Sequence, residues 1–324
     1  MCYGFNGERA LTQSLREHAP DRRTVLRGAV AGLLGAGAVG SAVSPAVAGQ
    51  RRARGSGDHR QPSTRSVPAG LISMQLWTMR AALSGTPGYD ATLSAMAEMG
   101  YQRVEQALGY FGRTATELKA FYNSIGIRAS SSHDGISPTM DAARTKFENA
   151  ATLGQNYIVV PYLNSSVLAD WQQWADQMNA EAALARRYGL KYGYHNHAHE
   201  FTIDLGGGVT PWQVLTSHLD PSLVHLEVDL YWAYTGGVNT GAPDPDQFVI
   251  DTIAAAPQRT LQFHVKDRDP ATGDMADLGT GVVDFQRIFA AHRVREYIVE
   301  NDTPDVTPLN TAQVGYQYLR DVRF

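Results

Sequence analysis

The sequence predicts a closed barrel of eight parallel strands, a (β/α)8 fold, and three observations support this prediction. Short apolar runs alternate with longer amphipathic patterns from Leu71 onward, which is the order that parallel α/β folds require. The run of eight strand candidates matches the number of strands in such a barrel. The first strand is followed by Trp77-Thr78-Met79-Arg80 and not by the glycine-rich turn of a dinucleotide-binding sheet.

The strand candidates are short apolar runs over residues 71–76, 102–106, 127–131, 157–160, 191–195, 225–229, 261–265 and 297–300. Helical patterns follow over residues 114–124, 140–153, 166–188, 210–218, 246–255, 284–291 and 310–319. The first helix is expected to begin after Asp90, because an aspartate side chain can cap the free amides of a helix N-terminus.

The N-terminal part of the chain is set apart from this pattern. Arg22 and Arg23 precede an uncharged stretch over residues 28–47, which ends in Ala46-Val47-Ala48. Such a pattern is typical of a cleaved twin-arginine export signal, predicted here over residues 1–48. A transmembrane anchor is the alternative, which the many Gly and Ala residues disfavour. A flexible linker is expected over 49–68 and a single barrel domain over 69–324, in a protein exported to the periplasm, cell surface or medium.

Composition narrows the class of protein further. The chain has 324 residues, of which 43% are apolar and 19% charged, as in a globular protein with a large core. The net charge of -4 gives no reason to expect a nucleic acid partner. The single cysteine, Cys2, lies in the segment that would be removed, so disulfides and thiolate metal sites are not expected in the mature protein.

Polar side chains gather where the predicted strands end, and in a parallel barrel these ends meet at one mouth. The longest polar run holds three of the ten histidines, His195, His197 and His199. Because side chains two apart in an extended chain face the same side, all three are predicted to face one space. His225 lies early in its strand and is expected to be structural.

The other strand ends carry carboxylates and further imidazoles: Glu105, His133, Glu227 with Asp229, His264 with Lys266, and Glu300. Imidazole and carboxylate ligands without a thiolate suit Mn, Co, Fe or Zn. Two imidazoles would be less natural for Mg. The sequence therefore predicts one divalent metal ion bound at the barrel mouth.

Five motifs resemble those of the sugar phosphate isomerase/epimerase family of xylose isomerase-like barrels. They are GYHNH followed by EF within residues 193–201, LEVDLYW (226–232), FHVKD (263–267), LGTGVVDF (278–285) and VEND (299–302). The resemblance covers about Leu71 to Leu319. It implies a xylose isomerase-like barrel that acts on a small carbohydrate, and members of the family often form dimers or tetramers, so a homo-oligomer is among the expectations.

The resemblance also implies which residues hold the metal. Similar ketose 3-epimerases use four side chains from strands five to eight, in the order Glu, Asp, His, Glu. The last three positions are matched here by Asp229, His264 and Glu300. The first position departs from the pattern, because His195 stands where a glutamate is expected. His197 and Glu200 are alternative ligands at this position, and the sequence leaves that choice open.

This departure bears on the reaction. In similar epimerases, the first and last carboxylates act as bases on opposite faces of the substrate. Here Glu300 remains a candidate base, while its partner is replaced, so His197, Glu200 or Lys266 is expected to move a proton instead. Such asymmetry favours isomerisation, dehydration or β-elimination over epimerisation. Exported relatives with a Tyr-His-Asn-His motif look like candidates for 3-keto-glycoside lyases, and an unphosphorylated sugar is expected as the substrate.

Four further residues are expected to contact the substrate. Glu105 and His133 close strands two and three, and an internal hydrogen-bond network is the alternative for both. Trp77 and Trp232 are expected to form an apolar wall against a sugar face.

Two other functions compete with a sugar isomerase or lyase. A nuclease of the same fold is disfavoured by the net charge, whereas a non-catalytic sugar-binding protein is compatible with the departure at His195.

Overall fold

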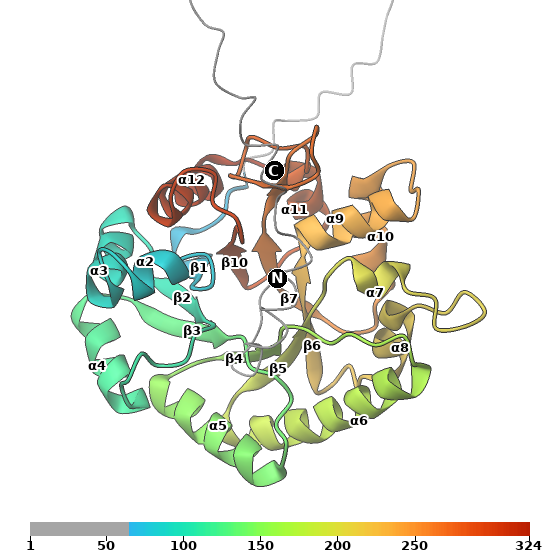
Figure 1. The fold of residues 1–324 in the computed structure, drawn as a ribbon, viewed down its shortest axis with the longest axis horizontal. Coiled ribbons are helices and arrows are strands. Elements are labelled where there is room, and N and C mark those ends of the chain that lie inside the picture. Colours follow the sequence, from blue (N-terminus) through green and yellow to red (C-terminus); the bar gives the residue numbers. More distant parts are fainter. Residues whose placement is uncertain (1–64) are drawn as a thin grey trace, which may run out of the picture.

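The computed structural model describes residues 65–324, in which eight parallel strands enclose a barrel inside a ring of helices (Figure 1). The strands are β1 (Ile72–Gln75), β2 (Arg103–Gln106), β3 (Arg128–Ser132), β4 (Tyr157–Val160), β5 (Lys191–His195), β6 (Val224–Asp229), β7 (Thr260–Val265) and β10 (Glu296–Val299). All eight strand candidates are confirmed, and no end of a strand differs from the prediction by more than one residue. The export signal expected over 1–48 lies outside the described residues, as does most of the linker expected over 49–68.

The strands lie in the order β3-β2-β1-β10-β7-β6-β5-β4, so neighbours along the chain are mostly neighbours in the sheet. The seam between β3 and β4 is joined by a parallel bridge between His133 and Val159. The backbone amide of Asp134 also donates to the carbonyl of Val159 across this seam, at 2.9 Å. The barrel is therefore nearly closed, and the end of β3 is held close to β4.

The outer layer contains eight helices near their predicted positions: α3 (Tyr89–Met99), α4 (Ala115–Ser124), α5 (Met140–Leu153), α6 (Leu168–Ala185), α8 (Pro211–His218), α10 (Pro245–Ala255), α11 (Phe285–Ala291) and α12 (Pro308–Asp321). Asp90 is not the cap of α3, so that prediction was wrong. The helix begins at Tyr89 directly after Gly88, and the Asp90 side chain instead accepts a hydrogen bond from Arg113 at 2.6 Å.

Several short elements at the mouth were not predicted. They are α2 (Arg80–Ser84), α7 (His199–Thr202), α9 (Leu230–Asn239) and the antiparallel pair β8 (Asp267–Arg268) with β9 (Met275–Ala276); two 3-10 turns, η1 (Ala69–Leu71) and η2 (Arg186–Tyr188), lie elsewhere. All but the two turns come directly after strand ends or lie in the loop after β7, so they shape the rim of the site.

Alternation along β6 shows how the barrel interior is built. Val224, Leu226 and Val228 belong to the apolar core, whereas the residues between them, His225, Glu227 and Asp229, lie on the other face of the strand. His225 contacts Gln262 of β7 at 2.9 Å in the lower barrel, which supports its expected structural role. Glu227 and Asp229 then lie at successively higher levels toward the mouth.

The two ends of the described chain lie together. Ser66 pairs with Arg323, the amide of Phe324 donates to the carbonyl of Arg65, and Val67 is buried. The packed chain therefore starts before residue 69, where the barrel was expected to begin. Within residues 65–324, no helix combines the length and apolarity needed to cross a membrane.

Candidate metal and active site

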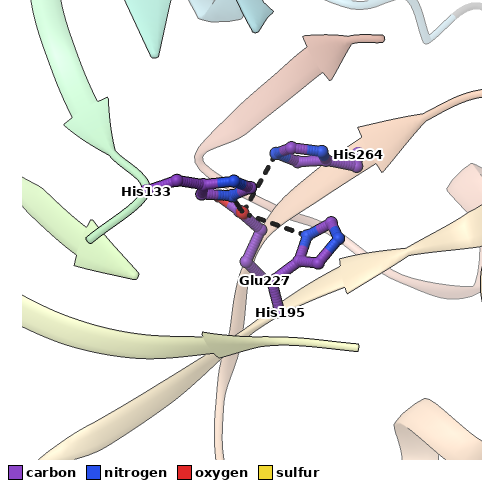
Figure 2. A group of neighbouring side chains, drawn as sticks. All are labelled: His133, His195, Glu227 and His264. Atoms are coloured by element: carbon purple, nitrogen blue, oxygen red, sulfur yellow. Dashed lines mark hydrogen bonds and ion pairs between the residues drawn. The ribbon is translucent and has the colours of Figure 1, made fainter. Parts of the chain in front are cut away.

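Three imidazoles converge on one carboxylate at the centre of the barrel, as Figure 2 shows. His133 follows β3, while His195, Glu227 and His264 lie on β5, β6 and β7. The Oε1 atom of Glu227 lies 2.7 Å from His133 Nε2, 3.0 Å from His264 Nε2 and 3.3 Å from His195 Nδ1. All four side chains are buried. The sequence placed Glu227 beside Asp229 among the polar strand ends, but it assigned no role in the site to Glu227.

Glu105 of β2 completes this inner cluster. Its Oε1 atom lies 2.7 Å from His264 Nε2 and 3.2 Å from His133 Nε2. Gln75 of β1 donates a hydrogen bond to the same oxygen at 2.7 Å. Glu105 and His133, which were predicted to contact substrate, thus lie within a buried network, and this network orients the rings of His133 and His264.

A second group lies on the mouth side of His264. Its Nδ1 atom is 2.6 Å from Glu300 Oε2, at the end of β10. Lys266 Nζ lies 2.7 Å from the same Glu300 oxygen, 3.0 Å from Asp229 Oδ2 and 3.4 Å from Asp302 Oδ2. An ammonium therefore lies between the two carboxylates that were predicted as metal ligands.

His195 and His264 each connect the inner cluster to the mouth-side group. His195 directs Nδ1 toward Glu227 and Nε2 toward Asp229, the latter pair 3.6 Å apart. His264 directs Nε2 toward the inner carboxylates and Nδ1 toward Glu300. A carboxylate on the far nitrogen of a metal-binding histidine fixes the ring and its tautomer. Glu105 and Glu227 can fix the rings of His195 and His264 in this way for a metal bound on the mouth side.

Burial and neighbouring charges set the protonation of these groups. Burial, reinforced by His264, lowers the pKa of His195 to about 3, so its ring is neutral and able to bind a metal. Burial raises the pKa of Asp229 to about 6 against the opposing charge of Lys266. Burial also opposes ionisation of Glu300, but Lys266 and His264 outweigh it and hold the Glu300 pKa well below its usual range.

The two inner carboxylates, Glu105 and Glu227, also differ from one another in the direction of their pKa shifts. Burial and the charge of Glu227 raise the pKa of Glu105 to about 7. Burial raises the pKa of Glu227 as well, but the charges of His264 and His133 lower it further, so the net pKa is well below the usual value. Glu227 is thus the charged partner of the three imidazoles.

The residues present fit a divalent metal. His133, His195, Glu227 and His264 offer ligand atoms within 4.8 Å of one another, and so do Asp229, His264 and Glu300. Within residues 65–324, neither ring nitrogen of His195 makes a hydrogen bond of good geometry, and Glu227 Oε2 is buried without a hydrogen-bond partner. Nitrogen and oxygen donors without sulfur suit Mn, Fe, Co or Zn. Of the predicted set, Asp229, His264 and Glu300 form the mouth-side group, while His195 belongs to the inner group and lies 3.6 Å from Asp229 through Nε2.

The structure separates the remaining residues of the histidine run. The chain turns into α7 at His199, whose Nε2 atom lies 2.7 Å from the carbonyl of Leu163. β5 ends at His195, so alternation along a strand does not place His197 and His199; the His199 ring lies 5.8 Å from the His197 ring but directs Nε2 to Leu163. Glu200 accepts hydrogen bonds from Tyr194 OH at 2.6 Å and from the amide of His197 at 2.8 Å. Through these two hydrogen bonds, Glu200 fixes the loop that carries His197.

Two tryptophans flank the mouth. The Trp232 ring lies 5.3 Å from the His197 ring, and Lys266 Nζ lies 5.7 Å from the Trp232 ring. The Trp77 amide donates to Gln75 Oε1 at 3.0 Å, so Trp77 is tied to the inner network through its backbone. Trp77 lies two residues after the end of β1, and Trp232 lies three residues after the end of β6.

Asp267 organises the rim, and sequence reasoning did not assign it a role. Its carboxylate accepts hydrogen bonds from the backbone amides of Arg268, Gly279, Gly281 and Val283, at 2.8–3.2 Å. Three of these four donors, Gly279, Gly281 and Val283, lie between β9 and α11, so one buried aspartate fixes this loop. Asp267 is the last residue of the FHVKD motif, and three of its donors belong to the LGTGVVDF motif. The presence of both motifs was the sequence signal that could have indicated this contact.

The fold and this centre define a (β/α)8 barrel with a buried histidine and carboxylate site at its mouth. The family model described as xylose isomerase-like TIM barrel matches residues 93–321, and the chain belongs to this family. The resemblance stated from the sequence motifs is thereby confirmed.

Named relatives agree with this assignment. An inosose dehydratase of Histophilus somni (strain 129Pt) is 26% identical over 178 residues, which is 48% of this chain and 56% of that protein. The chain thus spans about half the length of this curated relative. A sugar phosphate isomerase/epimerase from Parabacteroides distasonis ATCC 8503 has a similar fold, with a TM-score of 0.61 at 22% identity over 80% of this chain and 97% of that one. The IolI protein, solved with a bound zinc atom, has a TM-score of 0.57 at 14% identity over 76% and 96% of the two chains.

Proposed function

We propose that the protein is a divalent-metal-dependent enzyme that acts on a keto-sugar or related polyol by removing a proton next to a carbonyl. The observation that carries this proposal is the buried group of Asp229, His264 and Glu300, with His195 lying 3.6 Å from Asp229. The zinc in the IolI protein and the name of the dehydratase relative support it. We propose Mn, Co, Fe or Zn as the ion, because imidazole and carboxylate donors both face it.

A divalent ion held by these residues would polarise a substrate carbonyl and so acidify the neighbouring C–H bond. Glu300 is the candidate base, because Lys266 and His264 keep its carboxylate ionised. The position across from it holds His195 in place of a carboxylate, and Glu200 is engaged by Tyr194 and the His197 amide. The site therefore lacks a matched pair of carboxylate bases within the described residues, which supports isomerisation or elimination over epimerisation.

Two alternatives follow from the same site. A 3-keto-glycoside lyase would use the same proton abstraction and then lose the glycosidic substituent. A non-catalytic sugar-binding protein would keep the contacts without turnover.

We also propose that the protein is exported, on the basis of the paired arginines and the uncharged stretch after them. N-terminal sequencing of protein recovered outside the cytoplasm tests this, with cleavage expected after Ala48.

The proposed activity is tested by metal analysis and proton exchange together. Protein purified without chelator should contain a stoichiometric divalent metal. In heavy water it should place deuterium on the carbon next to the carbonyl of a keto-sugar, and Glu300→Gln should abolish this exchange while the fold is retained. Binding of the keto-sugar without exchange would favour the sugar-binding alternative, and a lack of metal dependence would contradict the proposal.

A further inference from the structure

A buried polar side chain beside the metal site has no partner in the described chain. Neither Nδ1 nor Nε2 of His197 makes a hydrogen bond, and the residue is only 2% exposed. The ring lies 5.1 Å from the His195 ring and 5.1 Å from the Tyr162 ring. Because a buried polar group without a hydrogen-bond partner destabilises a fold, a ligand that bonds to His197 would relieve this cost.

The indole of the neighbouring Trp232 also has a buried nitrogen without a hydrogen-bond partner in the described residues. Trp232 Nε1 is buried and donates to no acceptor within the described residues. Its ring lies 5.3 Å from the His197 ring, at an interplanar angle of 36°. Trp232 stands in the first turn of α9, directly after Asp229, whose carboxylate accepts from the Trp232 amide at 2.9 Å. The indole N–H is thus fixed to the same short segment as a candidate metal ligand.

The backbone holds both groups in place. Glu200 accepts the His197 amide, and Asn196 exchanges hydrogen bonds with the backbone of Asp229, at 3.0 and 3.3 Å. These contacts join the end of β5 to the end of β6. The unsatisfied nitrogens of His197 and Trp232 are therefore rigidly placed, as expected for groups that bind a ligand atom and not for side chains that relax toward water.

We propose that His197 and the Trp232 indole bind the leaving oxygen of the substrate, so that the reaction at this site is a β-elimination from a keto-polyol. This inference rests on the proposed function. The C–H bond next to the carbonyl breaks, a C=C bond forms, and the C–O bond on the next carbon breaks with its electron pair going to oxygen. One proton leaves carbon and one is taken up by the departing oxygen, which leaves as water or an alcohol.

The chemistry of the pair suits this role. An indole N–H is a donor only, and an imidazole offers one donor in its neutral form. Fixed donors directed at an oxygen that gains negative charge stabilise the transition state more than the ground state. The substrate class is accordingly a ketone that carries a hydroxyl or ether oxygen two carbons from its carbonyl.

The test uses the full chain loaded with Mn²⁺ and two probes, methyl 3-keto-β-glucoside and its 4-nitrophenyl counterpart. Wild type should incorporate deuterium between the carbonyl and the glycosidic carbon and release the alcohol. In Trp232→Phe and His197→Phe, release of methanol should fall by about 10-fold to 100-fold while exchange continues. Release of 4-nitrophenol should fall less, because that leaving group needs less stabilisation. Trp174→Phe, in the outer layer on α6, is the matched control and should behave as wild type.

A binding readout without metal accompanies the kinetics. The indole N–H resonance of Trp232, identified by its loss in Trp232→Phe, should shift when the methyl glycoside is added to metal-free protein labelled with ¹⁵N-tryptophan. Exchange without release in wild type would overturn the leaving-oxygen site and leave the proposed function intact. Absence of exchange would overturn the proposed function, while the indole shift would still report on the oxygen site. Equal loss of exchange and release in both variants, or no loss of release, would overturn the inference.

Discussion

His264 lies 2.6 Å from Glu300 through Nδ1, and this contact connects the inner cluster of the barrel to its mouth. The opposite nitrogen of the same ring faces Glu105 and Glu227. A single imidazole thus belongs to both candidate metal groups. The contribution of each group to metal binding can be separated by changing carboxylates that lie on only one side.

Asp229→Asn and Glu227→Gln test the two sides of the site. If the ion lies on the mouth side, Asp229→Asn removes a ligand and should lower Mn²⁺ affinity by more than 100-fold. Glu227→Gln should lower it by only about 10-fold to 100-fold, because Glu227 then acts by orienting His195 and His264. Titration calorimetry and elemental analysis measure both effects. Asp134→Asn, a carboxylate bonded to Ser132 outside both groups, is the control. A larger loss in Glu227→Gln would place the ion on the inner side.

Lys266→Met should destabilise the metal-free protein by about 3 kcal/mol, because it removes the buried ammonium that lies between the Asp229 and Glu300 carboxylates. Saturating Mn²⁺ should restore most of this stability, since a divalent cation compensates the same carboxylates. Urea unfolding with and without metal measures the effect. Lys146→Met, which removes the partner of Glu181 at 2.7 Å, should also destabilise the protein but gain nothing specific from metal. Equal rescue of both variants would contradict this account.

Gly281→Ala should disturb the rim loop. A Cβ atom at this position would collide with the Asp267 carboxylate and lie 2.5 Å from the carbonyl oxygen of Arg268. Because that carboxylate holds four backbone amides, we expect a cost of about 1–3 kcal/mol, measured as a lower melting temperature and urea midpoint. Gly135→Ala is the matched control, since nothing lies within 4 Å of its Cβ position. Similar melting temperatures for the two variants would argue against the collision.

Glu296 should make the stability of the barrel depend on pH. Burial raises the pKa of this carboxyl above its ordinary value, although Ser130 and Arg103 partly oppose the shift. With a raised pKa in the folded state, its contribution is complete below the unfolded pKa and is lost as pH rises through the folded pKa. The free energy of unfolding of wild type relative to Glu296→Gln should therefore fall as pH rises above the ordinary pKa of a glutamate.

An exposed glutamate provides a control of opposite sign. The Thr114 amide and hydroxyl lower the pKa of Glu117, so its contribution is present above the ordinary pKa and is lost as pH falls. The difference between wild type and Glu117→Gln should thus run in the opposite direction over the acidic range. Denaturant unfolding at several pH values measures both series, and parallel curves for Glu296→Gln and Glu117→Gln would contradict the burial argument.

Much of this site is visible in the sequence because local rules decide it. The eight strands follow from short apolar runs, and their polar last residues follow from the rule that parallel strands end at one mouth. His195, Asp229, His264 and Glu300 are found in this way, with the motifs giving their order. Alternation along a strand also puts Glu227 and Asp229 on the same face.

Other features were decided only by the tertiary structure. Alternation gives the face of a strand but not the depth at which a side chain meets its neighbours, and that depth depends on the stagger of strands far apart in sequence. For this reason Glu227 was not recognised as the meeting point of His133, His195 and His264. The turn into α7 removes His199 from the site, and the contacts of Glu200 bind it to Tyr194 and the loop. The sequence determined which chemical groups reach the mouth, and closure of the barrel decided which of them contact one another.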